Sequence, residues 1–227
     1  MGKFEVAKMT LFGNPNVGVY VHASDDHAII PPGVKRQDAE IIREVLGVEV
    51  VETTVSETRL VGVMLAGNNN GVLVPRTASE AEVEALRKSL RDYNVAVIDT
   101  RNNALGNLVA ANDRGAIVYP YMEKEAVKTI GDVLGVEVFQ REVAGIPTIG
   151  SIIVVTNRGC IVHPDAGEDE IKFLSQVFGV PVLPGTANFG ISFVRMGIVA
   201  NSKGAIVGEE TRGPEIVRIQ MALGGGM

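Results

Sequence analysis

The stretch from Asn102 to Gly115 reads NNALGNLVAANDRG, and the stretch from Gly145 to Gly159 reads GIPTIGSIIVVTNRG. In both, a glycine precedes an apolar run that ends in a polar turn, and these two glycines lie 44 residues apart. The same interval separates all members of the series Gly18, Gly62, Gly106 and Gly150. A period of this length indicates a chain built from repeated supersecondary units.

The turn that follows each apolar run repeats at the same step. Its positions are His27, Gly71, Gly115 and Gly159, and Gly204 follows after 45 residues. An asparagine stands two or three residues earlier in four of the copies, at Asn68, Asn112, Asn157 and Asn201. The chain therefore holds five copies of one unit of about 44 residues, which predicts one domain spanning residues 1–227.

Each unit contains the signals of a hairpin, a helix and a third strand. The runs LGNLVAAN and GAIVYP flank a turn of Asn, Asp and Gly, as in a β-hairpin, and Pro120 stands where the second strand ends. The segment EKEAVKTIGDVLG then places Ala126, Val127, Ile130, Val133 and Leu134 at helical spacing. Gly135 follows as a C-cap, and VEVFQR reads as a strand. The predicted unit is ββαβ.

The two ends of the chain indicate a ring. The last unit stops after its helix, without a third strand, whereas KFEVAKMT at the N-terminus precedes the first unit. Val6 lies 12 residues before Gly18, as Val50 lies before Gly62. The N-terminal strand is therefore expected to complete the fifth unit and remove exposed sheet edges. We predict an α/β fold in the form of a closed pseudo-fivefold propeller.

Composition and charge limit location and partners. The 227 residues are 46% hydrophobic with no Trp, and no apolar run reaches the roughly 20 residues that a membrane span needs. One cysteine allows no internal disulfide, which fits the cytoplasm. The net charge of −6 disfavours general binding to free nucleic acid. No membrane contact and no cofactor are expected.

The segments ALGNLVAANDRGAIVYP, GIPTIGSIIVVTNRGCIVHP, PGTANFGIS and GIVANSKGAIVG resemble the translation initiation factor 6 family of the archaeal type. The resemblance extends over essentially the whole chain and implies the pentein fold of five ββαβ units. It further implies a non-enzyme that binds the large ribosomal subunit near the sarcin-ricin loop, contacting ribosomal proteins and rRNA. Such binding prevents joining with the small subunit, and a role in large-subunit maturation is also implied.

The segments leading into each first strand are expected to gather on one face, because they recur around the ring. They carry arginines and exposed amides suited to a wet interface. The candidate ribosome-binding residues are Arg59, Arg101, Asn102, Asn103, Leu105, Asn107, Asn188 and Phe189. Asn107 also matches, by resemblance, the asparagine that faces the ribosome in the family. The alternative for these asparagines is that they only satisfy local turns.

The rival class is a pentein-type guanidine-modifying hydrolase or amidinotransferase with a Cys nucleophile. RGCIVHP offers Cys160 and His163, but residues three apart on a strand project to opposite faces, so we predict no catalytic site. His22 and His27 in HASDDH are assigned to an exposed hairpin tip without a metal.

Two further features of the sequence concern the outside of the ring. Acids that open two helices, Glu80, Glu82 and Glu84 in one and Glu168, Asp169 and Glu170 in the other, are read as solvated and as a poor surface for phosphates. A closed ring without a free sheet edge favours a monomer.

Overall fold

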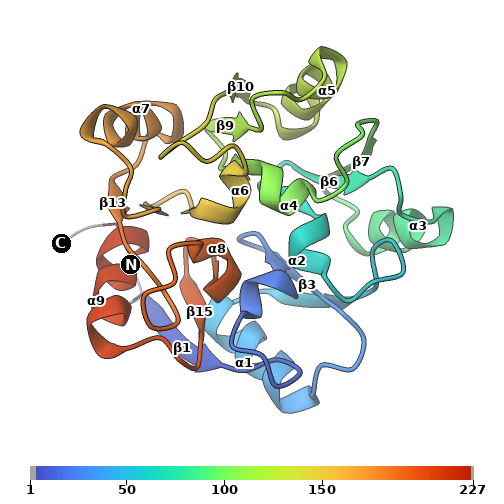
Figure 1. Cartoon of the computed structure of the whole chain (residues 1–227). Coiled ribbons are helices and arrows are strands. Elements are labelled where there is room, and N and C mark those ends of the chain that lie inside the picture. The colour runs from blue at the N-terminus through green and yellow to red at the C-terminus, as the bar shows by residue number, and fades with distance from the viewer. Residues whose placement is uncertain (1–3, 226–227) are drawn as a thin grey trace.

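The structure is a computed structural model that describes residues 4–225, and within them the chain forms five similar α/β units around a common centre (Figure 1). The first strands of the units are β2 (His22–Ala23), β5 (Ala66–Gly67), β8 (Val109–Ala111), β11 (Ile153–Val155) and β14 (Ile198–Ala200). The middle strands are β3 (His27–Ile30), β6 (Gly71–Pro75), β9 (Gly115–Val118), β12 (Cys160–Val162) and β15 (Gly204–Gly208). The third strands are β4 (Glu49–Glu52), β7 (Asn94–Ile98), β10 (Glu137–Gln140), β13 (Val182–Pro184) and β1 (Glu5–Met9).

Each unit has its own three-stranded sheet, and no sheet closes on itself. The first and middle strands form an antiparallel hairpin, while the third strand pairs parallel to the middle one, as the intervening helix requires. In the fifth unit β1 takes the place of the third strand, with Glu5 opposite Gly204 and Met9 opposite Gly208. The predicted pairing of the N-terminal strand with the fifth unit is confirmed.

A short helical turn precedes each hairpin, and here the sequence prediction was wrong. We expected the run LGNLVAAN to be a strand, but its first half forms a helix. The five short helices are η1 (Val17–Val19), α2 (Val61–Met64), α4 (Leu105–Leu108), α6 (Ile149–Ile152) and α8 (Val194–Gly197). They lie at the centre of the molecule, and each contacts the next, α8 contacting η1.

Close packing at the centre explains the period-44 glycines. A Cβ atom on Gly106 would lie 2.1 Å from the carbonyl oxygen of Gly62, and one on Gly62 would lie equally close to that of Gly18. Only glycine permits backbones to approach so closely. The second residue of each short helix faces the preceding unit. Packing between units, rather than local propensity, therefore favours the helical form of these segments.

The long helices cover the outside of the sheets. They are α1 (Arg36–Leu46), α3 (Glu80–Ser89), α5 (Lys124–Leu134), α7 (Glu168–Phe178) and α9 (Gly213–Leu223). In α5 the residues Ala126, Ile130 and Leu134 are buried, while Val127 and Val133 pack partly buried against the same cluster, as the helical spacing predicted. Gly135 caps the helix with a φ of +65°. The last helix differs, because Gly224 remains right-handed at −77°.

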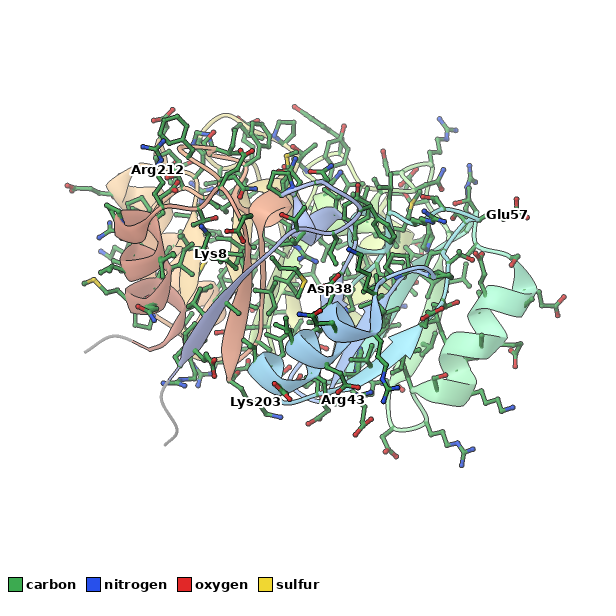
Figure 2. The ribbon with its side chains drawn as sticks, turned by 90° about the horizontal axis from the view of Figure 1, so that it is seen from below. Lys8, Asp38, Arg43, Glu57, Lys203 and Arg212 are labelled. Atoms are coloured by element: carbon green, nitrogen blue, oxygen red, sulfur yellow. The ribbon has the colours of Figure 1, made fainter. Side chains whose placement is uncertain are left out.

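The hairpin turns and the C-terminal ends of the long helices share one side of the molecule, which we call the turn face. Lys203 and Arg43 lie toward it in Figure 2. The turn face consists of residues 24–26, 68–70, 112–114, 156–158 and 201–203 together with the helix ends beside them.

Asparagines of the turn face join neighbouring units. Asn112 Nδ2 donates to the carbonyl oxygens of Thr156 (3.2 Å) and Phe178 (2.8 Å), and Asn112 is 3% exposed. Asn68 and Asn201 make the equivalent pairs of bonds. Asn68, Asn112 and Asn201 therefore bind units together as well as closing their own turns. In the fourth unit Thr156 closes the turn, and Asn157 donates to Asp113 of the third unit.

Candidate functional site

The opposite side of the molecule carries the segments that lead into the short helices, and we call it the loop face. It comprises residues 10–16, 53–60, 99–107, 141–148 and 185–193 together with Arg212. Figure 2 shows Glu57 and Arg212 on this side, away from Lys203. Four of these loops contain a tight turn closed by a pair such as Val55 and Thr58. The third unit, at residues 99–104, lacks one.

Most of these turns hold residues with a left-handed backbone. Among them are Phe12, Ser56, Glu57, Ala144, Asn188 and Phe189, with φ values from 46° to 61°. Non-glycine residues adopt this conformation infrequently, and it persists where surrounding contacts hold it.

Glutamates at the starts of the long helices supply such contacts. Glu215 of α9 accepts bonds from the backbone N–H groups of Phe189 (3.2 Å) and Gly190 (2.9 Å). In the second unit Glu82 of α3 accepts from Ser56 and Glu57, both at 2.9 Å. Each glutamate thus fixes a loop of the face from beneath.

These glutamates correct the expectation that all the helix-opening acids are solvated. Glu82 is only 8% exposed. Burial opposes ionisation of its carboxyl, but hydrogen bonds from Thr54, Ser79 and Glu57 outweigh burial and hold the pKa below its usual 4.5. Glu170 likewise accepts a bond from Ala144 N at 2.9 Å. The remaining acids, Glu80, Glu84, Glu168 and Asp169, are exposed as expected.

The loop face exposes aromatic side chains stacked with arginines. The Arg212 guanidinium carbon lies 3.6 Å from the ring centre of Phe189, which is 62% exposed. Arg59 lies 5.1 Å from the ring of Phe12, which is 40% exposed. Further exposed apolar side chains on this face are Leu60, Ile191 and Phe193. Exposed aromatic and arginine side chains are the residue types enriched at macromolecular interfaces.

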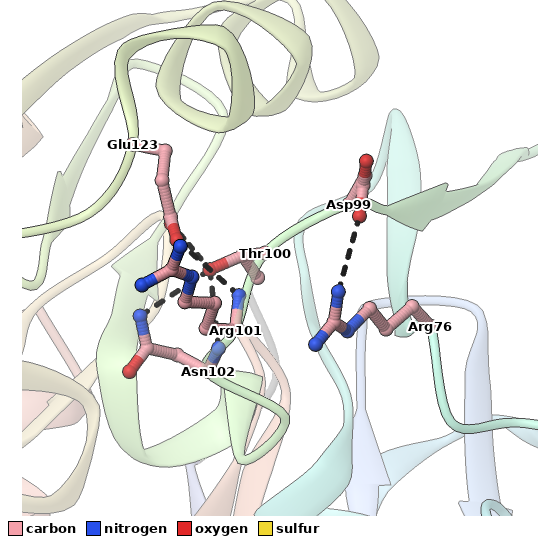
Figure 3. A network of polar contacts seen from close by, with 6 residues as sticks. All are labelled: Arg76, Asp99, Thr100, Arg101, Asn102 and Glu123. Carbon is pink, nitrogen blue, oxygen red and sulfur yellow. Dashed lines mark hydrogen bonds and ion pairs between the residues drawn. The ribbon is translucent and has the colours of Figure 1, made fainter.

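The loop of the third unit is built differently (Figure 3). Thr100 is buried and donates to Glu123 Oε2 at 2.6 Å, and the Arg101 N–H approaches the same carboxylate at 3.4 Å. Asn102 bonds through its backbone and side-chain nitrogens to Thr100 Oγ1. The Arg101 side chain is exposed. These hydrogen bonds fix the backbone of the loop, which presents the Arg101 guanidinium and the Asn102 amide on its surface.

The structure brings the predicted residues to one face but does not expose all of them. Arg59, Arg101 and Phe189 are exposed, and Asn102, Asn103 and Asn107 are half-buried. Leu105 is fully buried in the core. Asn188 is 3% exposed and donates to the Pro15 carbonyl oxygen at 2.9 Å, so it links the fifth unit to the first.

Sequence reasoning missed Phe12, Arg212, Ile191 and Phe193. Phe12 lies in a turn that lacked the motif used to find the other segments, and Arg212 is 23 residues from the ring on which it stacks. For Phe12 and Ile191 the available signal is an aromatic or apolar residue beside a glycine in a polar loop, as in LFGN and NFGISF.

The residues of the rival enzyme are not arranged for catalysis. Cys160 is fully buried, and burial raises the pKa of its thiol. His163 Nδ1 accepts a bond from Asp165 N at 3.1 Å instead of contacting the thiol. A nucleophilic cysteine needs a lowered pKa and access.

The histidine pair was assigned wrongly to an exposed hairpin tip. His22 and His27 are each 3% exposed, and only the acids between them form the tip. Within residues 4–225 no group of three or more His, Cys, Asp or Glu side chains could hold a metal ion. In the same range no helix is long and apolar enough to cross a membrane.

A family model described as "eIF-6 family" matches residues 6–222. The chain belongs to the eIF-6 family. Translation initiation factor 6 of Aeropyrum pernix is 54% identical over 100% of this chain and 98% of its own length. The proteins of that name from Staphylothermus marinus and Saccharolobus solfataricus are 40% and 42% identical. These two alignments cover 98% and 96% of this chain, and 99% and 98% of the relatives.

Proposed function

We propose that this chain is a translation initiation factor that binds the large ribosomal subunit through the loop face and so prevents the small subunit from joining. The observation that carries the proposal is the loop face itself, a surface of exposed arginines and aromatics. Buried and half-buried glutamates fix its loops, and the chain is similar over its full length to translation initiation factors. Participation in maturation of the large subunit follows from the same contact.

The exposed members of the loop face make the contact. Arg59, Arg101 and Arg212 pair with rRNA phosphates or with acidic side chains of a ribosomal protein, near the sarcin-ricin loop, while Phe189 fills an apolar site. Asn102, Asn103 and Asn107 donate amide bonds at the same interface. Leu105 and Asn188, being buried, keep the face in shape.

To exclude the small subunit sterically, the factor must be large enough and must occupy most large subunits. It does not need to catalyse a reaction. A standard interface buries about 800 Å² on each partner, which one face of a 24.1 kDa protein provides. Free factor at about 100 times its dissociation constant opposes subunit joining by about 2.7 kcal/mol. The buried thiol of Cys160 supports a function other than catalysis.

The same proposal includes the finer points of architecture and location. The five units form one closed pseudo-fivefold pentein domain, which the contact of α8 with η1 and the pairing of β1 with β15 support. The factor acts as a monomer in the cytoplasm, where its ribosomal partner is found.

Sucrose-gradient sedimentation of the protein with isolated subunits tests the proposal. We expect the protein to travel with the large subunit alone and to reduce joined ribosomes in proportion to its occupancy. Failure to sediment with either subunit would contradict it, and turnover of arginine or agmatine that is lost in Cys160→Ala would establish the enzyme instead.

A further inference from the structure

A cavity of about 60 Å³ lies at the centre of the molecule, between the short helices and the first strands. All five units contribute to its wall, mostly with small or aliphatic residues such as Ala66, Ala110, Val154 and Val199. The space exceeds the roughly 10–15 Å³ that one water-sized particle requires. Two side chains that line this cavity, His22 and Arg195, are polar.

Both polar side chains break the repeat. Strand register places His22 where the other units have Ala66, Ala110, Val154 and Val199, each paired with an Ile or Leu of the next strand. Arg195 is the second residue of α8, the position that Gly18, Gly62, Gly106 and Gly150 occupy in the other short helices. The two deviations fall in the first and fifth units, whose short helices touch.

His22 directs unsatisfied polar atoms at this region. It is 3% exposed, and neither ring nitrogen has a hydrogen-bond partner within residues 4–225. Burial, then the nearby His27 and Arg195, lower the pKa of His22 well below its usual value, so its ring is neutral. A neutral imidazole carries one N–H donor. A buried donor without an acceptor is destabilising, so an acceptor in the cavity is favoured.

Arg195 presents a positive charge to the same space. Burial lowers its pKa to about 10, so the guanidinium remains protonated at neutral pH. Among the described residues 4–225, no carboxylate pairs with it and none of the hydrogen bonds involves its side chain. Arg195 is half-buried. A charge partly removed from water without a counter-charge is unfavourable, and a mobile anion would lower that cost.

The carboxylates of Asp25 and Asp113 make their hydrogen bonds outside the central cavity. Asp25 and Asp113 line a separate cavity of about 50 Å³ next to the turn face. They accept bonds from Asn69, Asn157 and Ser202. A ring of residues common to both cavity walls separates the two spaces, namely Ala23, Gly67, Ala111, Val155 and Ala200.

We propose that the central cavity binds one small monovalent inorganic anion, chloride under ordinary conditions, between the guanidinium of Arg195 and the ring N–H of His22. One negative charge balances the single guanidinium, and the aliphatic wall suits a weakly hydrated halide. The anion stabilises the centre of the molecule, where the first and fifth units meet.

Crystals grown in sodium bromide test the site directly, because bromide scatters anomalously and water does not. We expect one anomalous peak in the central cavity, within about 3.5 Å of the Arg195 guanidinium, at hydrogen-bond range. Density that refines as water without an anomalous signal overturns the proposal, and so does bromide found only on the outer surface.

Urea unfolding gives a second test that needs no crystal. Chloride is titrated against gluconate at constant ionic strength, at a temperature where unfolding is reversible. We expect the urea midpoint to rise by roughly 1 M when chloride reaches about a hundred times its dissociation constant. Arg195→Gly, which installs the residue of the other four units, should abolish this rise, and His22→Ala should reduce it.

Arg87→Met is the matched control, since it removes an exposed arginine on α3 far from the axis. It should retain the full chloride response. If the response of Arg195→Gly equals that of Arg87→Met, or if the original chain shows no rise, the central cavity holds no anion. Should Arg195→Gly fail to fold, Arg195→Lys, which keeps the charge, must retain a peak in the bromide crystal.

Discussion

The turn face and the loop face lie on opposite sides of the five repeated units, but their polar groups serve different purposes. On the turn face, Lys203 donates to the carbonyl oxygens of Asp25 (2.6 Å) and Gly47 (2.9 Å), and Asn112 bridges two units. On the loop face, Arg59 and Arg212 stack on exposed rings and have no ion pair within residues 4–225. The polar side chains named on the turn face stabilise the fold, whereas the arginines of the loop face are available to bind a partner.

Changes on the turn face should therefore affect stability more than binding. Asn112→Ala removes the two hydrogen bonds to the carbonyl oxygens of Thr156 and Phe178, and also the two that its Oδ1 accepts from Arg114 N and Gly115 N. We expect the free energy of unfolding to fall by about 2–4 kcal/mol, by urea denaturation. The affinity of the folded fraction for the large subunit should be unchanged. A loss of binding without a loss of stability would contradict this division between the faces.

Changes on the loop face should do the reverse. Phe189→Ala removes a side chain that is 62% exposed and stacks on Arg212. The free energy of unfolding should therefore change by no more than about 0.5 kcal/mol. We expect affinity for the large subunit, measured by sedimentation, to drop about 10- to 30-fold. Val217→Ala, at an exposed position of α9, is the control and should bind normally. Equal binding by both variants would remove Phe189 from the interface.

Acid should weaken the loop face through its anchoring glutamates. The pKa values of Glu82 and Glu215 are lowered in the folded protein, because hydrogen bonds to their carboxylates outweigh burial. Their stabilisation is present above the usual value of 4.5 and is lost as pH falls through the lower folded pKa. Glu82→Gln should lower the free energy of unfolding by about 1–2 kcal/mol at neutral pH. The stability of this variant should also depend less on pH in the acid range. The exposed Glu84→Gln is the control, and an identical acid response of the two variants would count against Glu82 as an anchor.

The smallest expected effect is that of Asn107→Ser. This residue is half-buried in α4, and its removal takes away one amide from the face. We predict a decrease in affinity of about threefold to tenfold and no loss of stability. A pelleting assay with the large subunit measures it, and unchanged affinity would assign Asn107 to the scaffold.

The order of strands and helices could be predicted well from the sequence, because each strand and helix pattern recurs in five copies. Val6 could be assigned to the fifth unit from its distance to Gly18, and β1 pairs with β15 accordingly. The short helices could not be predicted, because a run such as LGNLV favours a strand by local propensity. Their helical form depends on backbone contacts between units, for example between Gly106 and the carbonyl oxygen of Gly62.

The candidate site was harder to predict residue by residue. Phe189 and Arg101 are exposed, as expected for residues of polar loops. Leu105 and Asn188 lie in the same kind of segment but are buried. Glu82 and Glu215 looked like ordinary helix-opening acids. Their bonds to loops 25 or more residues away exist only once the fold is formed. Sequence patterns located the face, while tertiary contacts decide which of its side chains reach a partner.

Amide hydrogen exchange with and without the large ribosomal subunit tests the central claim most directly, because it reads both faces of one protein in one experiment. We predict slower exchange on binding in residues 10–16, 53–60, 99–104 and 185–193 of the loop face, with residues 68–70 and 112–114 of the turn face unchanged. Protection confined to the turn face, with the loop face still exchanging freely, would contradict it.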